Sequence, residues 1–340
     1  MPLPRLTFFC ELEPGELQAL FASPDLIDDL CSLQAGVSLG LLDLSPERAE
    51  VVRRLNAAGV PVTAWLLLKK EHGYWCNQDN APETLACYEA FRTWTREQGL
   101  SWAAVGLDIE PDIQVMEELA LRPGSALPKL MRRALDGRRL SRAQAMYGDL
   151  AEMLRSDGHV LESYQFPIIA DERKVRSDLL RRLTGLVDLR SDREVWMLYS
   201  SFSRPLGVGY LWSYAPEAQA IAVGSTGGGI YTGMGDPSPL SWDEFSRDLR
   251  LAWHWTDHLY IFSLEGCVRQ GFLDRLKNFT WDTPIFFPED HAEVVARWRA
   301  ALQSSLWLSR YLGTILASAA VSIWIVRLIR NWFHRRESPG

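Results

Sequence analysis

Short apolar runs alternate with longer amphipathic stretches along residues 5–300. The runs have the length of buried strands and are bounded by turn-forming residues, and such an alternation is typical of β/α units around a parallel sheet. The pattern therefore predicts an α/β protein with eight parallel strands. The expected strands are Leu6–Glu11, Gly36–Leu42, Val60–Leu68, Ala103–Ile109, Val160–Phe166, Glu194–Ser200, Ala218–Gly224 and His258–Leu264.

Several stretches between the expected strands carry the signals that begin and end helices. Residues Ser45–Gly59 start with Ser45 as an N-cap and Pro46 at the first helical position, and they end at a glycine. Ala81–Gly99 and Ser241–Trp255 have comparable patterns. Eight strands with interleaved helices match a (β/α)8 TIM barrel, which takes about 250 residues. A doubly wound sheet is the competing fold, but neither GxGxxG nor GxxxxGKS/T follows an early strand.

The C-terminal end differs from the expected barrel domain of residues 1–300. Residues 311–326 carry no charge, and arginines flank them on both sides. If these arginines snorkel, the apolar span extends over 306–329, which is long enough for a ~30 Å hydrocarbon core. We therefore predict a membrane-anchor helix followed by a basic tail at 330–340, with a buried final helix as the alternative. The tail favours a cytosolic C-terminus, but no signal peptide precedes the barrel, so the side of the membrane stays open.

The composition narrows the class of function. Hydrophobic residues make up 47% and charged residues 23% of the chain, which excludes disordered and multi-span membrane classes. A net charge of -7 argues against duplex DNA as a partner, because phosphate contacts need a basic surface. The five cysteines form no CxxC pair, so neither a disulfide framework nor a structural zinc site is indicated. We predict no cofactor, no metal and no nucleic acid. The chain has 14 tryptophans, whose large flat side chains suit either a hydrophobic core or contact with the faces of sugars.

Acidic residues gather where the fourth expected strand ends. Asp108, Glu110 and Asp112 occupy alternate positions of an extended chain, so they point to one side. Active sites of (β/α)8 barrels form at the carboxyl ends of the strands. Crowding of buried carboxyl groups raises the pKa of at least one of them, which suits general-acid catalysis. Tyr199 at the end of the sixth strand and Glu265 after the eighth complete the expected catalytic set.

Further polar and aromatic residues at strand ends predict a carbohydrate subsite. The loop Glu71–Asn80 combines aromatic rings, which offer flat apolar faces to sugars, with amides that bind hydroxyl groups. The candidate substrate-binding residues are Glu13, Tyr74, Trp75, Asn77, Glu162, Tyr164, Gln165 and Trp212. The long segment Ile113–His159 is either a solvated helix pair or a lid or basic patch that touches anionic lipid. The Gly-rich segment Gly224–Gly229 is either a turn or a phosphate cradle.

Two of these strand ends resemble a known family. Val105–Asp112 (VGLDIEPD) resembles the fourth-strand signature D-G-x-D-x-D-x-E of chitinase-like glycoside hydrolases of family 18, and Trp196–Tyr199 is similar to their M-x-Y. The resemblance implies a retaining glycosidase-type barrel with an acid at the end of the fourth strand and a tyrosine that holds the substrate. This sequence departs from the signature, because Val105, Glu110, Asp112 and Ser200 replace Asp, Asp, Glu and an acid.

The sequence therefore favours a membrane-tethered, glycoside hydrolase-like enzyme that acts on a glycan or glycoconjugate. Glu110 would donate the proton, either with Asp108 positioning it or with Glu265 as the second carboxylate across the mouth of the barrel. One alternative is a catalytically inactive, carbohydrate-binding barrel. The other is a metal-dependent phosphodiesterase that uses Glu11 or Glu13 with the acids of the fourth strand.

Overall fold

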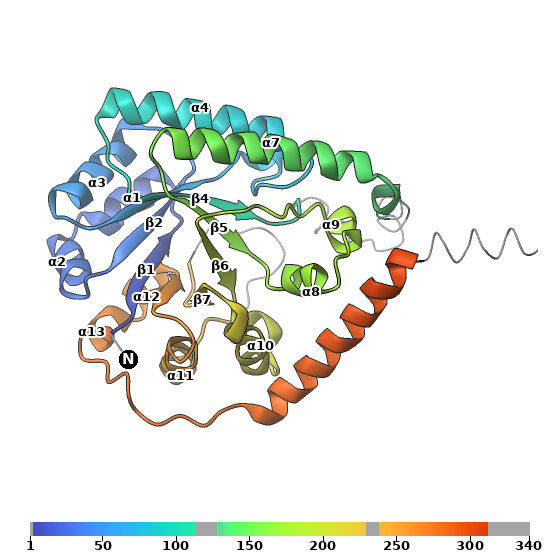
Figure 1. Ribbon diagram of the computed structural model, residues 1–340. Coiled ribbons are helices and arrows are strands. Elements are labelled where there is room, and N and C mark those ends of the chain that lie inside the picture. The colour runs from blue at the N-terminus through green and yellow to red at the C-terminus, as the bar shows by residue number, and fades with distance from the viewer. Residues whose placement is uncertain (1–2, 113–127, 129, 131, 229–237, 312–340) are drawn as a thin grey trace, which may run out of the picture.

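The computed structural model describes residues 3–112, 128, 130, 132–228 and 238–311. Its described residues contain eight parallel strands that close into a barrel in the order of the chain, so the predicted (β/α)8 architecture is confirmed (Figure 1). Every expected strand is present within three residues at each end. The strands are β1 Arg5–Cys10, β2 Gly36–Leu41, β3 Val62–Leu66, β4 Ala104–Ile109, β5 Leu161–Gln165, β6 Arg193–Met197, β7 Ala220–Gly224 and β8 His258–Phe262.

Helices surround the barrel, and local signals explain where several of them begin. Ser45 accepts a hydrogen bond from the Arg48 backbone as the N-cap of α3, and Ser241 forms a capping box with Glu244 at α11. The α-helices are α1 Pro14–Phe21, α2 Pro24–Ser32, α3 Pro46–Ala57, α4 Ala81–Gln98, α7 Gly137–Ser156, α8 Ile168–Lys174, α9 Leu179–Thr184, α10 Gly207–Tyr214, α11 Trp242–Trp253, α12 Leu264–Arg269 and α13 Phe272–Lys277.

Buried side chains fill the space on both sides of the strands. Residues such as Phe8, Leu107 and Leu259 pack between strands and helices, whereas Phe9, Trp65, Tyr164 and Tyr260 belong to a separate cluster. Because side chains alternate along a strand, this second cluster fills the inside of the barrel. The barrel interior is therefore a packed aromatic core.

Glycine at one strand position makes room for one of these side chains, Tyr164. A Cβ added at Gly106 would lie 2.3 Å from the Tyr164 hydroxyl, which is too close for any side chain. The Tyr164 hydroxyl instead crosses the barrel and hydrogen-bonds the Ser38 hydroxyl at 2.7 Å. Gly106 of β4 thus leaves room for Tyr164 of β5, which fills the interior of the barrel.

A helix over residues 289–311 closes the described chain and crosses the predicted boundary between domain and anchor. Within the described residues, no helix combines the length and the apolar character that a membrane crossing requires. The predicted anchor begins inside this helix, but residues 312–329 and the basic tail 330–340 lie outside the described residues. The membrane anchor stays a prediction.

Candidate active site

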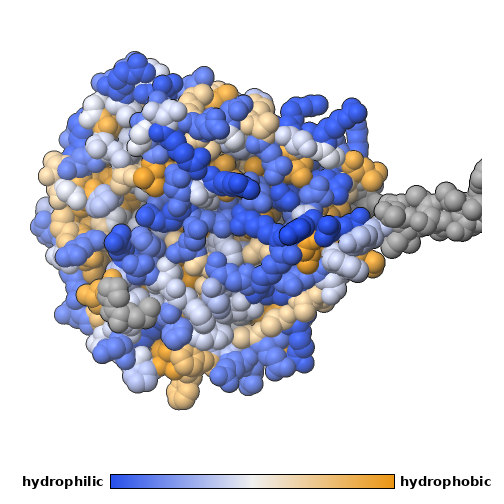
Figure 2. Space-filling model, in the orientation of Figure 1, coloured by the Kyte–Doolittle hydropathy of each residue, from blue (hydrophilic) through white to orange (hydrophobic). Residues whose placement is uncertain are grey.

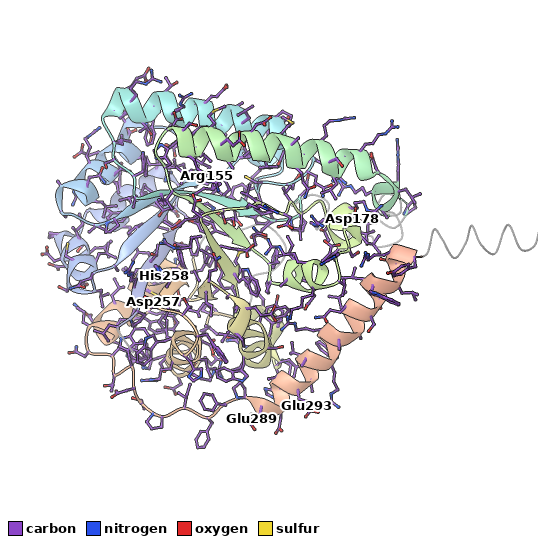
Figure 3. All side chains as sticks on the ribbon, in the orientation of Figure 1. Arg155, Asp178, Asp257, His258, Glu289 and Glu293 are labelled. Carbon is purple, nitrogen blue, oxygen red and sulfur yellow. The ribbon has the colours of Figure 1, made fainter. Side chains whose placement is uncertain are left out.

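The topology defines two ends of the barrel. All strands run in parallel, so their carboxyl ends surround one opening, which we call the mouth. Figure 3 labels Asp257 and His258 where β8 begins, and it labels Asp178 near α9 on the opposite side of the molecule. Gln78, in the loop after β3, donates from its side chain to the Leu186 carbonyl at 2.7 Å, which places α9 at the mouth.

Three carboxyl groups lie together at the mouth. Asp108 and Glu110 come from the end of β4, and Glu11 directly follows β1. Glu11 and Asp108 are 5% and 3% exposed, and Glu110 is half-buried. Asp108 and Glu110 share a side-chain hydrogen bond in which the protonated Asp108 donates.

Burial and mutual repulsion keep protons on this cluster. Burial, then the negative charges of Glu110 and Glu11, raise the pKa of Asp108 well above its usual range. Burial and the charge of Glu11 raise the pKa of Glu110 to about 8. At neutral pH the pair therefore holds a carboxylic acid that is able to donate a proton.

Tyr199 lies close enough to the same carboxyl groups for their charges to act on its hydroxyl. It is 8% exposed and belongs to the cluster inside the barrel. Burial and then the charges of Asp108, Glu110 and Glu11 raise the pKa of its hydroxyl well above the usual value. The predicted catalytic residues Asp108, Glu110 and Tyr199 are thus brought together.

The loop after β3 holds Tyr74 over the mouth. Its backbone turns back on itself, because the Leu68 amide donates to the Tyr74 carbonyl at 2.8 Å and Cys76 forms a parallel bridge with Ile109 of β4. Tyr74 takes φ 64°, a left-handed conformation that is rare outside glycine. The Tyr74 hydroxyl donates a hydrogen bond to Glu11, so the loop fixes the position of that carboxylate.

The remaining predicted residues of this loop have different surroundings. Trp75 is half-buried and meets the Tyr74 ring edge-on, with centroids 5.5 Å apart. The Asn77 amide donates to the Trp75 carbonyl and accepts from the Asp79 backbone, so Asn77 shapes the loop. Asp112 lies against the turn at Gly73. Glu13 is exposed and directly precedes α1, and its negative charge helps to raise the pKa of the Tyr74 hydroxyl.

Glu265 is placed differently from the expectation. It is buried in the first turn of α12 and accepts a hydrogen bond from the Cys10 thiol. Cys10 faces the helix layer outside the barrel, so this contact places Glu265 against the outer side of β1. Glu11, which the catalytic set omitted, is the carboxylate that the structure places beside Glu110. The signal for it was the position of Glu11 at the end of the first strand.

Four predicted substrate-binding residues lie away from the mouth or fill the barrel. Glu162 is the second residue of β5, so it lies at the amino end, where it pairs with Arg193 at 2.7 Å and accepts from the Tyr260 hydroxyl. Tyr164 fills the interior. The Gln165 amide faces outward and donates to Ser163 at 3.0 Å. Trp212 of α10 packs on Trp255, which precedes β8, at 5.3 Å between ring centroids. The sequence of a strand end does not show which end of the barrel or which face of the strand a side chain occupies.

The glycine-rich segment after β7 is tied to the start of α12. The Thr226 amide donates to the Phe262 carbonyl at 2.7 Å, and the Ser263 hydroxyl donates to the Gly227 carbonyl at 2.9 Å. The segment therefore joins two neighbouring loops in its described part, which ends at Gly228. Among the residues that the structure describes, no three His, Cys, Asp or Glu side chains are arranged to hold a metal ion.

Solved structures with a similar fold share little sequence with this chain. No protein-family model matches the chain, and no curated protein matches it. Among solved structures, a D-allulose 3-epimerase from Methylomonas sp. is similar at 11% identity and a TM-score of 0.42, over 88% of this chain and 99% of that one. A β-1,3-glucanosyltransferase mutant from Rhizomucor miehei, in complex with laminaritriose, is similar at 13% identity and a TM-score of 0.39, over 76% and 86%.

Proposed function

We propose that the protein is a glycoside hydrolase-type enzyme that cleaves a glycan or glycoconjugate by carboxylate acid catalysis at the mouth of the barrel. The observation that supports this most directly is the hydrogen-bonded pair of Asp108 and Glu110, whose pKa values are raised beside Glu11. A proton held at neutral pH on a half-buried carboxyl group is what departure of a glycosidic oxygen requires. The resemblance of Val105–Asp112 to the family 18 signature supports the same activity.

The proposed reaction uses the cluster as a two-carboxylate system. Glu110 gives its proton to the glycosidic oxygen as the C–O bond breaks, and the bonding electrons leave with that oxygen. Glu11, positioned by the Tyr74 hydroxyl, supports the positive charge that develops at the anomeric carbon. A water molecule then adds to this carbon and returns a proton to Glu110. Asp108 holds Glu110 in position through their hydrogen bond.

One aromatic residue at the mouth suits a sugar substrate. Trp75 is half-buried on the loop after β3, whereas the Tyr74 and Tyr199 rings are buried in the protein. Aromatic rings stack on the apolar faces of sugar rings. The uncharged run 311–326 between flanking arginines supports membrane tethering through residues 306–329 as a further part of this proposal.

The test is hydrolysis of a panel of chromogenic glycosides and natural glycans by the full chain and its variants. We expect Glu110→Gln to lower kcat by about 10²–10⁴-fold, because the proton donor is lost. The matched control is Glu16→Gln, which changes an exposed glutamate on α1 and is expected to keep full activity. Activity of the wild type should fall as the pH rises above about 8, where Glu110 loses its proton.

Two outcomes would count against the proposal. A Glu110→Gln variant that cleaves as fast as the wild type would remove the proposed acid. Glycan binding without cleavage by any variant would favour the carbohydrate-binding barrel, which the departures of Val105 and Asp112 from the family signature also allow.

A further inference from the structure

The helix over residues 289–311 is fixed to the barrel by a buried ion pair. Arg299 is 8% exposed and bonds the fully buried Asp171 of α8 at 2.9 Å. The same guanidinium bonds Glu217 at 2.7 Å and stacks on the Tyr214 ring at 3.8 Å from its centroid. The direction of this helix relative to the barrel is therefore set by the fold.

This helix runs toward the mouth of the barrel. Near its start, the His291 backbone packs against Gly209 of α10 so closely that a Cβ would lie 2.5 Å away. At its other end, Arg310 donates to the Val175 carbonyl at 2.9 Å, directly after α8. Because α8 follows the carboxyl end of β5, the chain leaves the described structure at the mouth side (Figure 1). The uncharged run 311–326 begins at this point.

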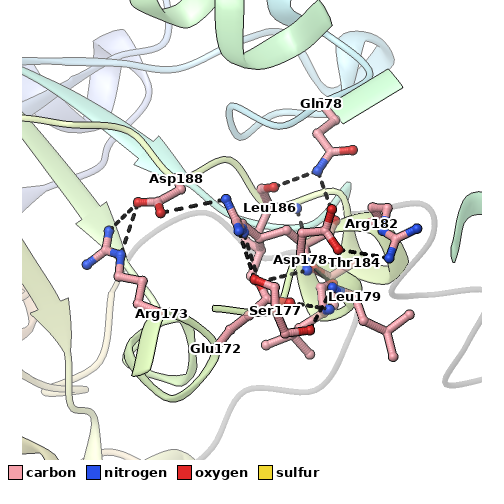
Figure 4. Close-up of polar contacts among 12 residues, drawn as sticks. Gln78, Glu172, Arg173, Ser177, Asp178, Leu179, Arg182, Thr184, Leu186 and Asp188 are labelled. Carbon is pink, nitrogen blue, oxygen red and sulfur yellow. Dashed lines mark hydrogen bonds and ion pairs between the residues drawn. The ribbon is translucent and has the colours of Figure 1, made fainter. Parts of the chain in front are cut away.

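The segments around this exit point form one connected edge of the mouth. Glu172 of α8 is buried and accepts from the backbone and the guanidinium of Arg181 in α9, which joins the two short helices (Figure 4). Arg182 of α9 in turn donates to the Ala134 carbonyl at 2.7 Å, just before α7. The end of the C-terminal helix, α8, α9 and the start of α7 are thus linked by contacts.

Exposed cations line this edge. Arg132, Arg138 and Arg142 are exposed and make no ion pair with another described residue, and with Arg310 they form what we call the basic rim. Of the acidic side chains nearby, Asp79 pairs with Arg133 at 2.8 Å, and the exposed Asp136 caps α7 by accepting from the Arg139 backbone. An edge with more exposed arginines than acids attracts anionic lipid headgroups within about a Debye length, ~8 Å at physiological salt.

Large apolar side chains are exposed on the same edge. Leu135, between the arginines of the basic rim, is 83% exposed. Trp307, Leu308 and Tyr311 share one face of the last described turns and are 51%, 53% and 41% exposed. Figure 2 shows hydrophobic residues at the surface near the point where this helix leaves the described structure. Aromatic residues beside basic ones are typical of the membrane–water interface.

We propose that the basic rim and the Trp307–Tyr311 turn dock on an anionic lipid surface, so that the mouth of the barrel opens toward the membrane. Three observations support this orientation. The direction of the C-terminal helix is fixed by the fold, the uncharged run follows it in the sequence, and arginines and large apolar side chains are exposed on the same edge. The proposal concerns a binding surface and does not depend on the reaction proposed above. If both hold, the accessible substrate is a glycoconjugate close to the bilayer.

The test measures which end of the barrel lies near the lipid. The full chain is reconstituted in phosphatidylcholine vesicles with or without phosphatidylserine, and the vesicles carry a headgroup-linked energy acceptor. A donor dye is attached to Ser141→Cys at the start of α7, or to Asp257→Cys at the amino end of β8 as the matched position, in a Cys31→Ser background that removes the exposed cysteine. We expect strong transfer from residue 141, increased by phosphatidylserine, and weak transfer from residue 257.

Charge variants separate lipid docking from tethering alone. Arg138→Gln with Arg142→Gln should weaken the phosphatidylserine-dependent contact by about 30-fold and return the transfer to its level without phosphatidylserine. Arg5→Gln with Arg96→Gln removes the same charge from exposed positions at the other end and should change nothing. Equal transfer from the two dye positions, or no effect of phosphatidylserine, would overturn the proposal. A chain that enters no vesicle would overturn it as well. None of these readouts requires glycan cleavage.

Discussion

The charge state of Glu110 makes a prediction about stability that requires no knowledge of the substrate. In the folded state burial and the charge of Glu11 raise the Glu110 pKa from 4.5 to about 8. Between these two values the folded chain holds a proton that the unfolded chain has released. The contribution of Glu110 to stability therefore falls as the pH rises through this window and levels off above pH 8. Glu110→Gln abolishes this loss because glutamine carries no charge.

The size of the effect follows from the same pKa. At about 1.4 kcal/mol per pKa step, a rise from 4.5 to about 8 corresponds to at most about 5 kcal/mol. Glu110 is half-buried, so water screens part of the repulsion, and we expect about 2–3 kcal/mol. For a domain of this size that corresponds to roughly 5 °C in Tm. The variant should match the wild type at pH 5 and exceed it by this amount at pH 9.

The assay is urea denaturation and thermal unfolding of both proteins at several pH values between 5 and 9. Glu16→Gln, at an exposed site on α1, controls for the general loss of a negative charge. The informative quantity is the difference between each variant and the wild type as a function of pH. A difference for Glu110→Gln that stays constant from pH 5 to pH 9, or that falls as the pH rises, would refute the electrostatic account of this cluster.

Three further substitutions test the packing that positions the site. Tyr74→Phe removes the donor to the buried Glu11 and should cost about 1–3 kcal/mol in urea denaturation, so an unchanged midpoint would show that this hydrogen bond contributes little. Gly106→Ala places a methyl group 2.3 Å from the Tyr164 hydroxyl and should destabilise the fold by at least about 1–3 kcal/mol, unless the barrel interior is less tightly packed than the structure shows. Arg299→Ala leaves the carboxylate of Asp171 buried without its guanidinium partner, and it should lower the free energy of unfolding by about 3–5 kcal/mol. It should also expose residues 289–311 to limited proteolysis. Arg297→Ala, at an exposed position of the same helix, serves as the control.

The elements of the barrel were predictable because their signals are local. The apolar runs of the strands are bounded by turn-forming residues, and this pattern does not depend on which strands lie next to each run in the fold. The helix over Ser45–Gly59 was predicted from its N-cap and its terminal glycine, and the structure shows Ser45 capping α3. The pairing of Asp108 and Glu110 was also predictable, because alternate residues of one strand point to the same side.

The errors in the site came from contacts that cross the barrel. Glu162 and Gln165 flank Tyr164 on the same short strand, yet one lies at the amino end of the barrel interior and the other faces the helix layer. Glu265 was expected to face Glu110, but the path of the chain after β8 turns it toward Cys10. Contacts between residues that are distant in sequence decide that Glu11, and not Glu265, lies beside Asp108 and Glu110.

By itself, the sequence determined the number and order of the strands, the acidic end of the fourth strand and the candidate proton donor, because each depends on periodicity within a few residues. Only the tertiary structure decided that Glu11 completes the cluster, that Tyr74 reaches over it and that Arg299 fixes the direction of the C-terminal helix. These features depend on burial and on charges brought together across the fold. The shifted pKa of Glu110 is a property of that shared environment.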